Sequence, residues 1–231
     1  MQSAAGTDAA PLGSLLTMHI PDGFIAPQFY LPAYLVAGGF WVWASRDLRQ
    51  RLDEETIPRL AVITALAYVV GLVMLPLPGG SSGHLVGIGI LAMLFGIRLA
   101  FLAYSLVLLL QALLLGAGGM TALPVNALAV GLIGASVMAF SMRWQHRRHP
   151  LPYLAAGAYL AVILPALAVA LVLGLQPAIA HREDGTPLFF PFGPEVVVPA
   201  ILLPHLVIGG VEALLTLAVW RYARSRGWLD V

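Results

Sequence analysis

Residues 85–116, LVGIGILAMLFGIRLAFLAYSLVLLLQALLLG, form the longest apolar run in this 231-residue sequence. An α-helix rises about 1.5 Å per residue, so one helix over this run would be much longer than the about 30 Å hydrocarbon layer of a membrane. The run is interrupted at Phe95–Arg98, FGIR, where a glycine stands close to the only charged residue of the segment. The pattern therefore predicts two short helices that meet at Phe95–Arg98.

The rest of the chain has the same apolar character. Hydrophobic residues make up 60% of the sequence and charged residues only 10%, against about 25% charged residues in an average soluble domain. This composition excludes a water-soluble globule. Further apolar segments cover 30–44, 60–77, 123–142, 151–175 and 196–220. With 85–116 divided in two, the sequence predicts an all-α fold, a polytopic membrane helix bundle with seven transmembrane helices.

The arginines predict the orientation of this bundle. All 12 basic residues are arginines, and basic residues concentrate in the cytoplasmic loops of membrane proteins. Seven spans place every arginine except Arg182 on one side of the membrane. We therefore expect the N-terminus outside and the C-terminus in the cytoplasm. The arginines are dispersed among apolar runs, which argues against nucleic acid as a partner.

The first residues differ in character from the remainder of the chain. Residues 1–17, MQSAAGTDAAPLGSLLT, contain no basic residue and no apolar core of the kind that a signal peptide needs. They are predicted to form a flexible N-terminal extension, and residues 18–231 a single transmembrane metal-binding domain.

Histidines on the outer side are the first candidates for a binding site. The sequence has no cysteine, so a metal site would use nitrogen and oxygen ligands. His19 lies in a turn before the first span, and His84 ends a loop of prolines, glycines and serines that includes Ser82. The two imidazoles are placed to meet over the bundle, although a lone histidine at a membrane interface is more often a hydrogen-bonded structural residue.

Other polar residues lie within or beside the spans. His205 and Glu212 are seven positions apart and therefore share one face of the last span. Ionisable groups at such depth are costly, which favours a functional role. The alternative is that Glu212 forms a hydrogen bond across helices and His205 packs as a neutral polar residue. Asp22 either anchors His19 or caps the first helix, and Asn126 is expected to form an interhelical hydrogen bond.

Four stretches together resemble the CbiM/NikM family, the substrate-binding membrane components of energy-coupling factor transporters for cobalt and nickel. They are MHIPDG at 18–23, GSSGH at 80–84, QALLLGAGGMTAL at 111–123 and HxxxGxxEALxT at 205–216. The resemblance implies Ni²⁺ or Co²⁺ as the transported substrate and a location in the cytoplasmic membrane of a bacterium or archaeon.

The resemblance also implies a set of ligands. In the family the MHIPDG motif begins at the initiator methionine, and its amino group, the next backbone nitrogen, the next imidazole and a loop histidine hold the metal. The corresponding donors here are the Met18 nitrogen, the His19 nitrogen and side chain, and His84, a planar four-nitrogen set that Ni²⁺ favours. Candidates for supporting the site or lining the ion's path are Asp22, Ser82, Asn126, His205 and Glu212.

Three residues depart from the family pattern. Met18 is internal in this sequence, so its nitrogen would be an amide, a much poorer donor than an amine. We therefore expect residues 1–17 to be absent from the working protein. Ala117 and Ala129 stand where the family has an acidic residue and an asparagine, and these changes affect the polar contacts around the ligands.

The source of the energy for transport distinguishes a transport component from the alternative functions. The sequence has no G-x-x-x-x-G-K-S/T nucleotide-binding loop,, so energy for transport is expected to come from partners. The resemblance to the family implies a transmembrane coupling (T) subunit, cytoplasmic ATPase subunits and a small accessory membrane subunit as these partners. The alternative is an intramembrane metal-dependent hydrolase built on His84, His205 and Glu212, but no H-E-x-x-H motif supports it. A serine hydrolase built on Ser81 or Ser82 would lack the G-x-S-x-G motif, and a channel would need a polar stripe through several spans.

Overall fold

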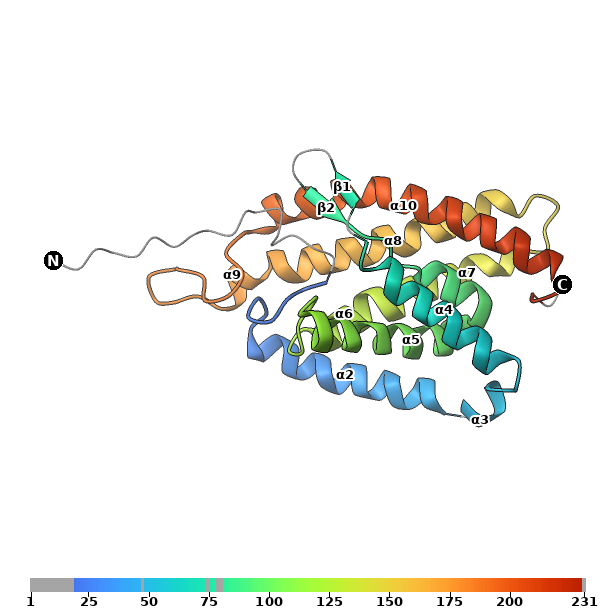
Figure 1. Cartoon of the computed structure of the whole chain (residues 1–231). Helices are drawn as coiled ribbons and strands as arrows, with labels where there is room; N and C mark the ends of the chain where they lie inside the picture. Colours follow the sequence, from blue (N-terminus) through green and yellow to red (C-terminus); the bar gives the residue numbers. More distant parts are fainter. Residues whose placement is uncertain (1–18, 47, 74, 78–80, 230–231) are drawn as a thin grey trace.

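The computed structural model describes residues 19–229 apart from residues 47, 74 and 78–80. Almost all of the described chain is helical (Figure 1). The elements are α2 (Pro27–Ser45), α3 (Leu48–Arg51), α4 (Thr56–Val70), β1 (Leu75–Leu77), β2 (Ser81–Gly83), α5 (Ile88–Leu115), α6 (Leu123–Asn126), the π-helix η1 (Ala127–Ile133), α7 (Gly134–Ser141), the 3-10 helix η2 (Met142–Trp144), α8 (Leu151–Gly174), α9 (Gln176–Ile179) and α10 (Pro194–Ser225).

Helix α5 consists of two helices joined at Gly96, where φ is +72° and ψ 178°. A straight helix would separate Gly87 from Gln111 by about 36 Å. Instead, a Cβ built at Gly87 would lie 3.3 Å from Ala67 Cβ, and one built at Gly71 would lie 2.7 Å from Gln111 Nε2. Ala67 and Gly71 are only one helical turn apart on α4, so the chain reverses at Gly96. The prediction of two short helices that meet here is confirmed.

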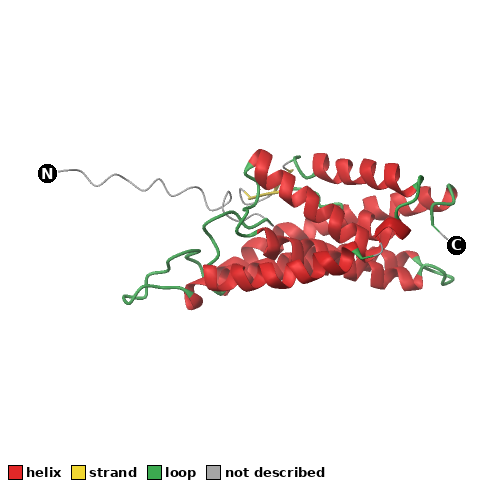
Figure 2. Cartoon of the chain, turned by 90° about the horizontal axis from the view of Figure 1, so that it is seen from below, coloured by secondary structure: helices red, strands yellow, loops and turns green. Residues whose placement is uncertain are grey.

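Several helical segments of the described residues are long and apolar enough to cross a membrane. By length and composition they are Leu123–Trp144, Leu151–Ile179, Pro194–Ser225 and Ile88–Leu115, the last of which the reversal at Gly96 divides into two helices. Helix α4 is a shorter apolar helix. The helices run side by side in an elongated bundle (Figure 2). They agree with the predicted membrane helix bundle, whereas the number of seven spans remains a prediction.

The loop before His84 contains the one exception to the all-α prediction within the described residues. Strands β1 and β2 form a short antiparallel ribbon in which Leu75 pairs with Gly83 and Leu77 with Ser81. The pairing places Leu75 beside Gly83, the residue directly before His84. It therefore fixes the point from which the chain continues into His84.

Glycines allow the helices of the bundle to pack closely. A Cβ at Gly157 of α8 would lie 2.0 Å from the Ser141 hydroxyl of α7, and one at Gly209 of α10 would lie 3.1 Å from the Tyr159 ring of α8. Small residues at such crossings bring backbones together. Helix α10 packs along α8, while α2 lies against α5 and α6 (Figure 1).

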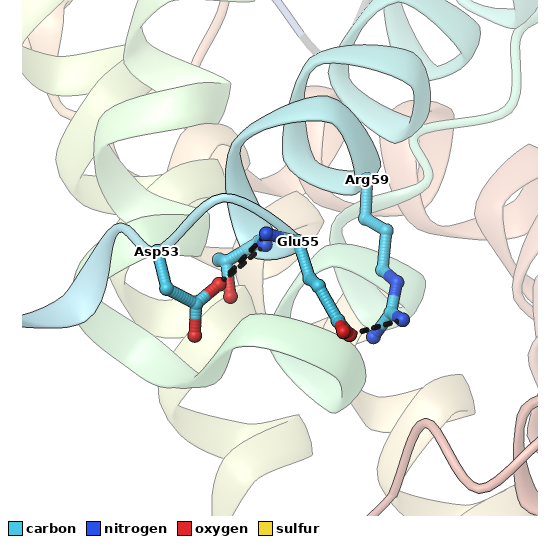
Figure 3. A network of polar contacts seen from close by, with 4 residues as sticks. Asp53, Glu55 and Arg59 are labelled. Atoms are coloured by element: carbon cyan, nitrogen blue, oxygen red, sulfur yellow. Dashed lines mark hydrogen bonds and ion pairs between the residues drawn. The ribbon is translucent and has the colours of Figure 1, made fainter.

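Most of the arginine-bearing segments gather at one end of the bundle. Helix α3 and the C-terminal part of the chain lie there in Figure 1, and the Arg59 guanidinium stacks 5.2 Å from the centre of the Trp228 ring. Figure 3 shows the start of α4 at this end, where the Asp53 carboxylate accepts the Thr56 N–H at 2.6 Å and Glu55 pairs with Arg59 at 2.7 Å. The opposite end carries β1, β2 and α9 (Figure 1).

Candidate metal-binding site

Two imidazoles meet at the end of the bundle that lies opposite the arginines. His19 comes from the segment before α2 and His84 from the segment between β2 and α5. Their ring centroids are 4.8 Å apart, with the ring planes tilted by 56°. Both side chains are buried, with exposed fractions of 3% and 8%. The prediction that these two imidazoles meet is confirmed, while metal binding by them remains a prediction.

Hydrogen bonds fix the orientation of two histidine rings. His84 Nδ1 lies 3.0 Å from the Leu85 carbonyl oxygen, and His205 Nδ1 lies 2.6 Å from the Ile201 carbonyl oxygen. A carbonyl oxygen only accepts, so each Nδ1 carries the proton and donates. The Nε2 atom of each ring therefore keeps its lone pair, which is the form that binds a metal.

Burial keeps the paired imidazoles neutral. It lowers the pKa of His19, and the neighbouring His84 and His205 rings lower it further. Burial also lowers the pKa of His84, against the opposing effect of its hydrogen bond to the Leu85 carbonyl. Neutral imidazole is the ligand form of histidine. The pair can therefore accept a metal cation without first losing protons at neutral pH.

Asn126 holds the backbone beside His19. Its Oδ1 accepts the Ile20 N–H at 3.0 Å, and its Nδ2 donates to the Ile20 carbonyl at 3.1 Å. Asn126 and Ile20 are both buried, so these bonds are shielded from water. The prediction that Asn126 forms an interhelical hydrogen bond was wrong, because its amide binds the backbone of the segment before α2 instead of another helix.

Asp22 joins the same segment to the loop after α5. Its carboxylate accepts the Met120 N–H at 3.0 Å and the Thr121 N–H at 2.7 Å, together with the Thr121 hydroxyl at 2.5 Å. Burial raises the pKa of Asp22, but the hydrogen bonds from Thr121 and Met120 outweigh it, so the pKa lies below its ordinary value. Helix α2 has no side-chain cap, so the capping alternative for Asp22 was wrong.

Glu212 holds the backbone that follows His84. Its Oε1 accepts the N–H groups of Val86 and Gly87, the latter at 2.9 Å. Glu212 is only 2% exposed, and Gly87 takes a left-handed conformation with φ +73° directly before α5. The alternative in which Glu212 forms a hydrogen bond across helices is therefore wrong in its partner, because the carboxylate binds the segment before α5 instead of a helix. This contact fixes the backbone that follows His84.

Sequence reasoning missed a similar contact made by Gln176. Its Oε1 accepts the Ala26 N–H at 2.9 Å at the start of α2, and its Nε2 donates to the Val172 carbonyl at 2.9 Å. Gln176 is fully buried. The signal in the sequence that could have identified Gln176 was a lone amide side chain at the end of an apolar run.

Two other predicted site residues cannot be placed. Met18 lies outside the described residues, and the structure describes only the backbone of Ser82.

The described residues contain no group of three or more His, Cys, Asp and Glu side chains that could hold a metal ion. A metal on His19 and His84 would therefore need further donors, such as backbone nitrogens. Gly119 leaves room for the segment that carries His19, because a Cβ there would lie 2.3 Å from the Asp22 nitrogen. Gly118 lies beside His19 and takes φ +80°, a conformation that favours glycine,.

The fold defines a helical membrane protein in which two buried imidazoles, His19 and His84, lie in contact at one end of the bundle. The chain belongs to the CbiM family, because the family model described as "Cobalt uptake substrate-specific transmembrane region" matches residues 19–228. Proteins of this family are transport components, which agrees with the expectation that the chain is not an enzyme and gives no support to a hydrolase.

Relatives extend from bacteria to archaea. The chain is 36% identical over 214 residues to the "Probable fused nickel transport protein LarMN" of Lactiplantibacillus plantarum, covering 90% of this chain and 64% of the relative. It is 35% identical to the "Fused nickel transport protein NikMN" of Rhodobacter capsulatus, with 87% and 60% covered. The chain thus spans less than two thirds of these fused relatives. The "Putative metal transport protein MJ1569" of Methanocaldococcus jannaschii is 31% identical, with 90% and 93% covered.

The fold is also found in a solved structure. A crystal structure titled as that of a transition metal transporter superposes with a TM-score of 0.83 at 32% sequence identity, covering 92% of this chain and 95% of the other. The helix arrangement is therefore shared along nearly the whole chain.

Proposed function

We propose that this chain is the substrate-capture component of an ATP-driven energy-coupling factor importer for nickel or cobalt ions. The observation that carries the proposal is the pair of buried neutral imidazoles, His19 and His84, 4.8 Å apart at the end opposite the arginines. Relatives named as nickel transport proteins and a family named for cobalt uptake support it.

The proposed ligands are the Met18 nitrogen, the His19 backbone nitrogen and imidazole, and His84. The His19 backbone nitrogen and its own ring close a six-membered chelate ring only through Nδ1, since the ring then contains the metal, N, Cα, Cβ, Cγ and Nδ1. His84 would bind through Nε2, because its Nδ1 donates to the Leu85 carbonyl. Together with the Met18 amine these donors would form the planar set that Ni²⁺ favours.

This donor set requires a free amine at Met18. We therefore propose that the metal-binding form begins at Met18, without residues 1–17. Intact-mass measurement of protein from its native source tests this directly. A metal-binding species that keeps residues 1–17 would contradict the proposal and would require another donor, with Asp22 or His181 as the first candidates.

The proposed topology follows from the arginines. We place the end with α3 and the C-terminal residues in the cytoplasm and the two-histidine end outside, with seven spans that count the halves of α5 separately. Basic residues favour the cytoplasmic side. The ion would enter near His19 and His84 and pass inward, with His205 as the next imidazole on its path, since its Nε2 keeps a lone pair. Ser82 is a further candidate for the entry side.

The energy for uptake must come from partner proteins. The sequence contains no nucleotide-binding loop,, and the names of fused relatives indicate that further modules accompany this one. We propose a transmembrane coupling subunit, cytoplasmic ATPase subunits and a small accessory membrane subunit as partners.

Uptake by proteoliposomes tests this proposal. The isolated chain should give no sustained accumulation of nickel or cobalt, whereas the chain assembled with coupling and ATPase subunits should give accumulation that depends on ATP. Accumulation against a gradient by the isolated chain, without ATP, would instead indicate a secondary transporter.

A further inference from the structure

The Tyr104 hydroxyl lies next to the imidazole of His19. Tyr104 belongs to the second half of α5 and is 1% exposed. Its hydroxyl oxygen is 3.4 Å from His19 Nε2, and the two rings meet edge to face with centroids 6.4 Å apart. The reversal at Gly96 brings this tyrosine back along the bundle to the histidine pair, so no local sequence motif marks it.

The chemistry of the proposed chelate gives this contact a specific role. That role rests on the proposed function, in which the His19 backbone nitrogen and Nδ1 bind the ion together. A neutral imidazole that binds through Nδ1 carries its proton on Nε2. Once the metal is bound, Nε2–H is therefore buried and needs an acceptor, since an unpaired buried N–H costs about 1–3 kcal/mol.

We propose that Tyr104 is a positioning residue for metal capture, and that its hydroxyl oxygen accepts the hydrogen bond from His19 Nε2–H. This bond selects the imidazole tautomer that leaves Nδ1 free for the ion. It also limits rotation of the ring about the Cβ–Cγ bond and so holds Nδ1 in the plane of the other donors. Partners of this kind around metal-binding histidines set both the tautomer and the ring orientation.

The surroundings of Tyr104 separate this role from simple packing. Phe101 and Leu108 lie one turn before and one turn after it on the same face of α5, and both are buried apolar residues. A phenylalanine at position 104 would therefore suit the packing as well as tyrosine does. The hydroxyl is the feature that packing leaves unexplained, and a buried tyrosine hydroxyl usually has a hydrogen-bond partner.

The test compares nickel binding by Tyr104→Phe with two reference variants in the metal-binding form of the chain. Isothermal titration with Ni²⁺ should show affinity at least about tenfold weaker than wild type for Tyr104→Phe. Tyr153→Phe is the matched control, because Tyr153 stacks on Trp144 at the arginine-bearing end and should bind nickel like wild type. His84→Ala should lose high-affinity binding.

These outcomes distinguish the inference from the proposed function. Normal affinity in His84→Ala would overturn the proposed function itself. Loss of binding in His84→Ala together with affinity within about twofold of wild type in Tyr104→Phe would overturn only the role of Tyr104. A role in positioning also predicts that the visible absorption band of planar Ni²⁺ shifts or weakens in Tyr104→Phe at saturating metal.

A second measurement does not depend on how the variant folds. Planar four-coordinate Ni²⁺ is diamagnetic, so nitrogen-15 NMR of histidine-labelled wild-type protein can report the tautomer of each ring. We expect His19 with Nδ1 bound to the metal and Nε2 protonated. A His19 ring with Nε2 bound and Nδ1 protonated would contradict the inference.

Discussion

Replacement of Asn126 by alanine should weaken nickel binding although Asn126 is not a proposed ligand. The change removes both hydrogen bonds between the Asn126 amide and the backbone of Ile20, the residue that comes directly after His19. Each buried polar group left without a partner costs about 1–3 kcal/mol. The N–H and the carbonyl of Ile20 together would therefore cost about 2–6 kcal/mol if the segment stayed in place.

The segment before α2 is expected to relax and to recover part of this cost. Asp22 and Gln176 hold it at other points, so the smaller end of the range is the better guide. Since about 1.4 kcal/mol corresponds to a tenfold change in affinity, we expect Asn126→Ala to bind nickel about 10–100-fold more weakly than wild type.

Isothermal titration of the purified variants measures this change, with Gln176→Ala as the matched control. Gln176 is also a buried amide that accepts a backbone N–H of the same segment, but it does so at Ala26, next to α2 instead of next to His19. The control should lower the thermal midpoint as Asn126→Ala does and change the nickel affinity much less. Affinity within about twofold of wild type for Asn126→Ala, or an equal loss in Gln176→Ala, would refute the reasoning.

Three further predictions concern the segments that carry the site. Glu212→Ala should lower the thermal midpoint and weaken nickel binding, because the buried N–H of Val86 and the half-buried N–H of Gly87 lose their acceptor, at about 1–3 kcal/mol for the buried group and less for the other. Glu212→Gln keeps an oxygen and should lose less than half as much; equal losses in thermal scans and titrations would contradict this. Asp22 has a lowered pKa, so its charge stabilises the fold fully above the unfolded-state pKa of about 3.9, and this contribution is lost as the pH falls from there through the lower folded-state pKa. The difference in thermal midpoint between wild type and Asp22→Asn should therefore be present at neutral pH and shrink steadily below about pH 4; a difference that is constant with pH would count against this. Gly96→Ala should destabilise the fold by about 1–3 kcal/mol, because φ +72° with ψ 178° is a region that essentially only glycine adopts,. A Cβ there meets no atom within 4 Å, so the backbone conformation alone sets this cost, and an unchanged thermal midpoint would contradict the prediction.

The reversal in α5 was predictable because two independent signals coincide. The run at 85–116 is too long for one membrane-spanning helix, and Phe95–Arg98 places a glycine and an arginine where the break is needed. The strand pairing of Leu75–Leu77 with Ser81–Gly83 was not predicted, because three-residue strands that contain proline and glycine leave no alternating pattern. The sequence indicated a loop there, and backbone pairing shapes that loop.

The contact between His19 and His84 could be predicted from the sequence, whereas the hydrogen bonds that hold their segments in place could not. His19 and His84 stand out as ionisable residues at the ends of apolar runs, so their meeting could be inferred from topology. The contacts of Asn126 and Glu212 end on backbone groups of distant segments, and any residue type could supply those groups. The backbone group in such a hydrogen bond leaves no signal in the sequence, because almost every residue type carries the same N–H and C=O groups. Polar residues in the spans could be identified as important, while their partners required the fold.

Nickel titration of His84→Ala beside His181→Ala tests the central claim most directly. His181 is exposed on the loop after α9 and is predicted to lie on the same outer side, but it is not a proposed ligand. We predict that His84→Ala loses high-affinity binding of nickel or cobalt while remaining inserted and folded, and that His181→Ala binds like wild type. Unchanged affinity in His84→Ala would contradict the proposal that the two imidazoles capture the transported ion.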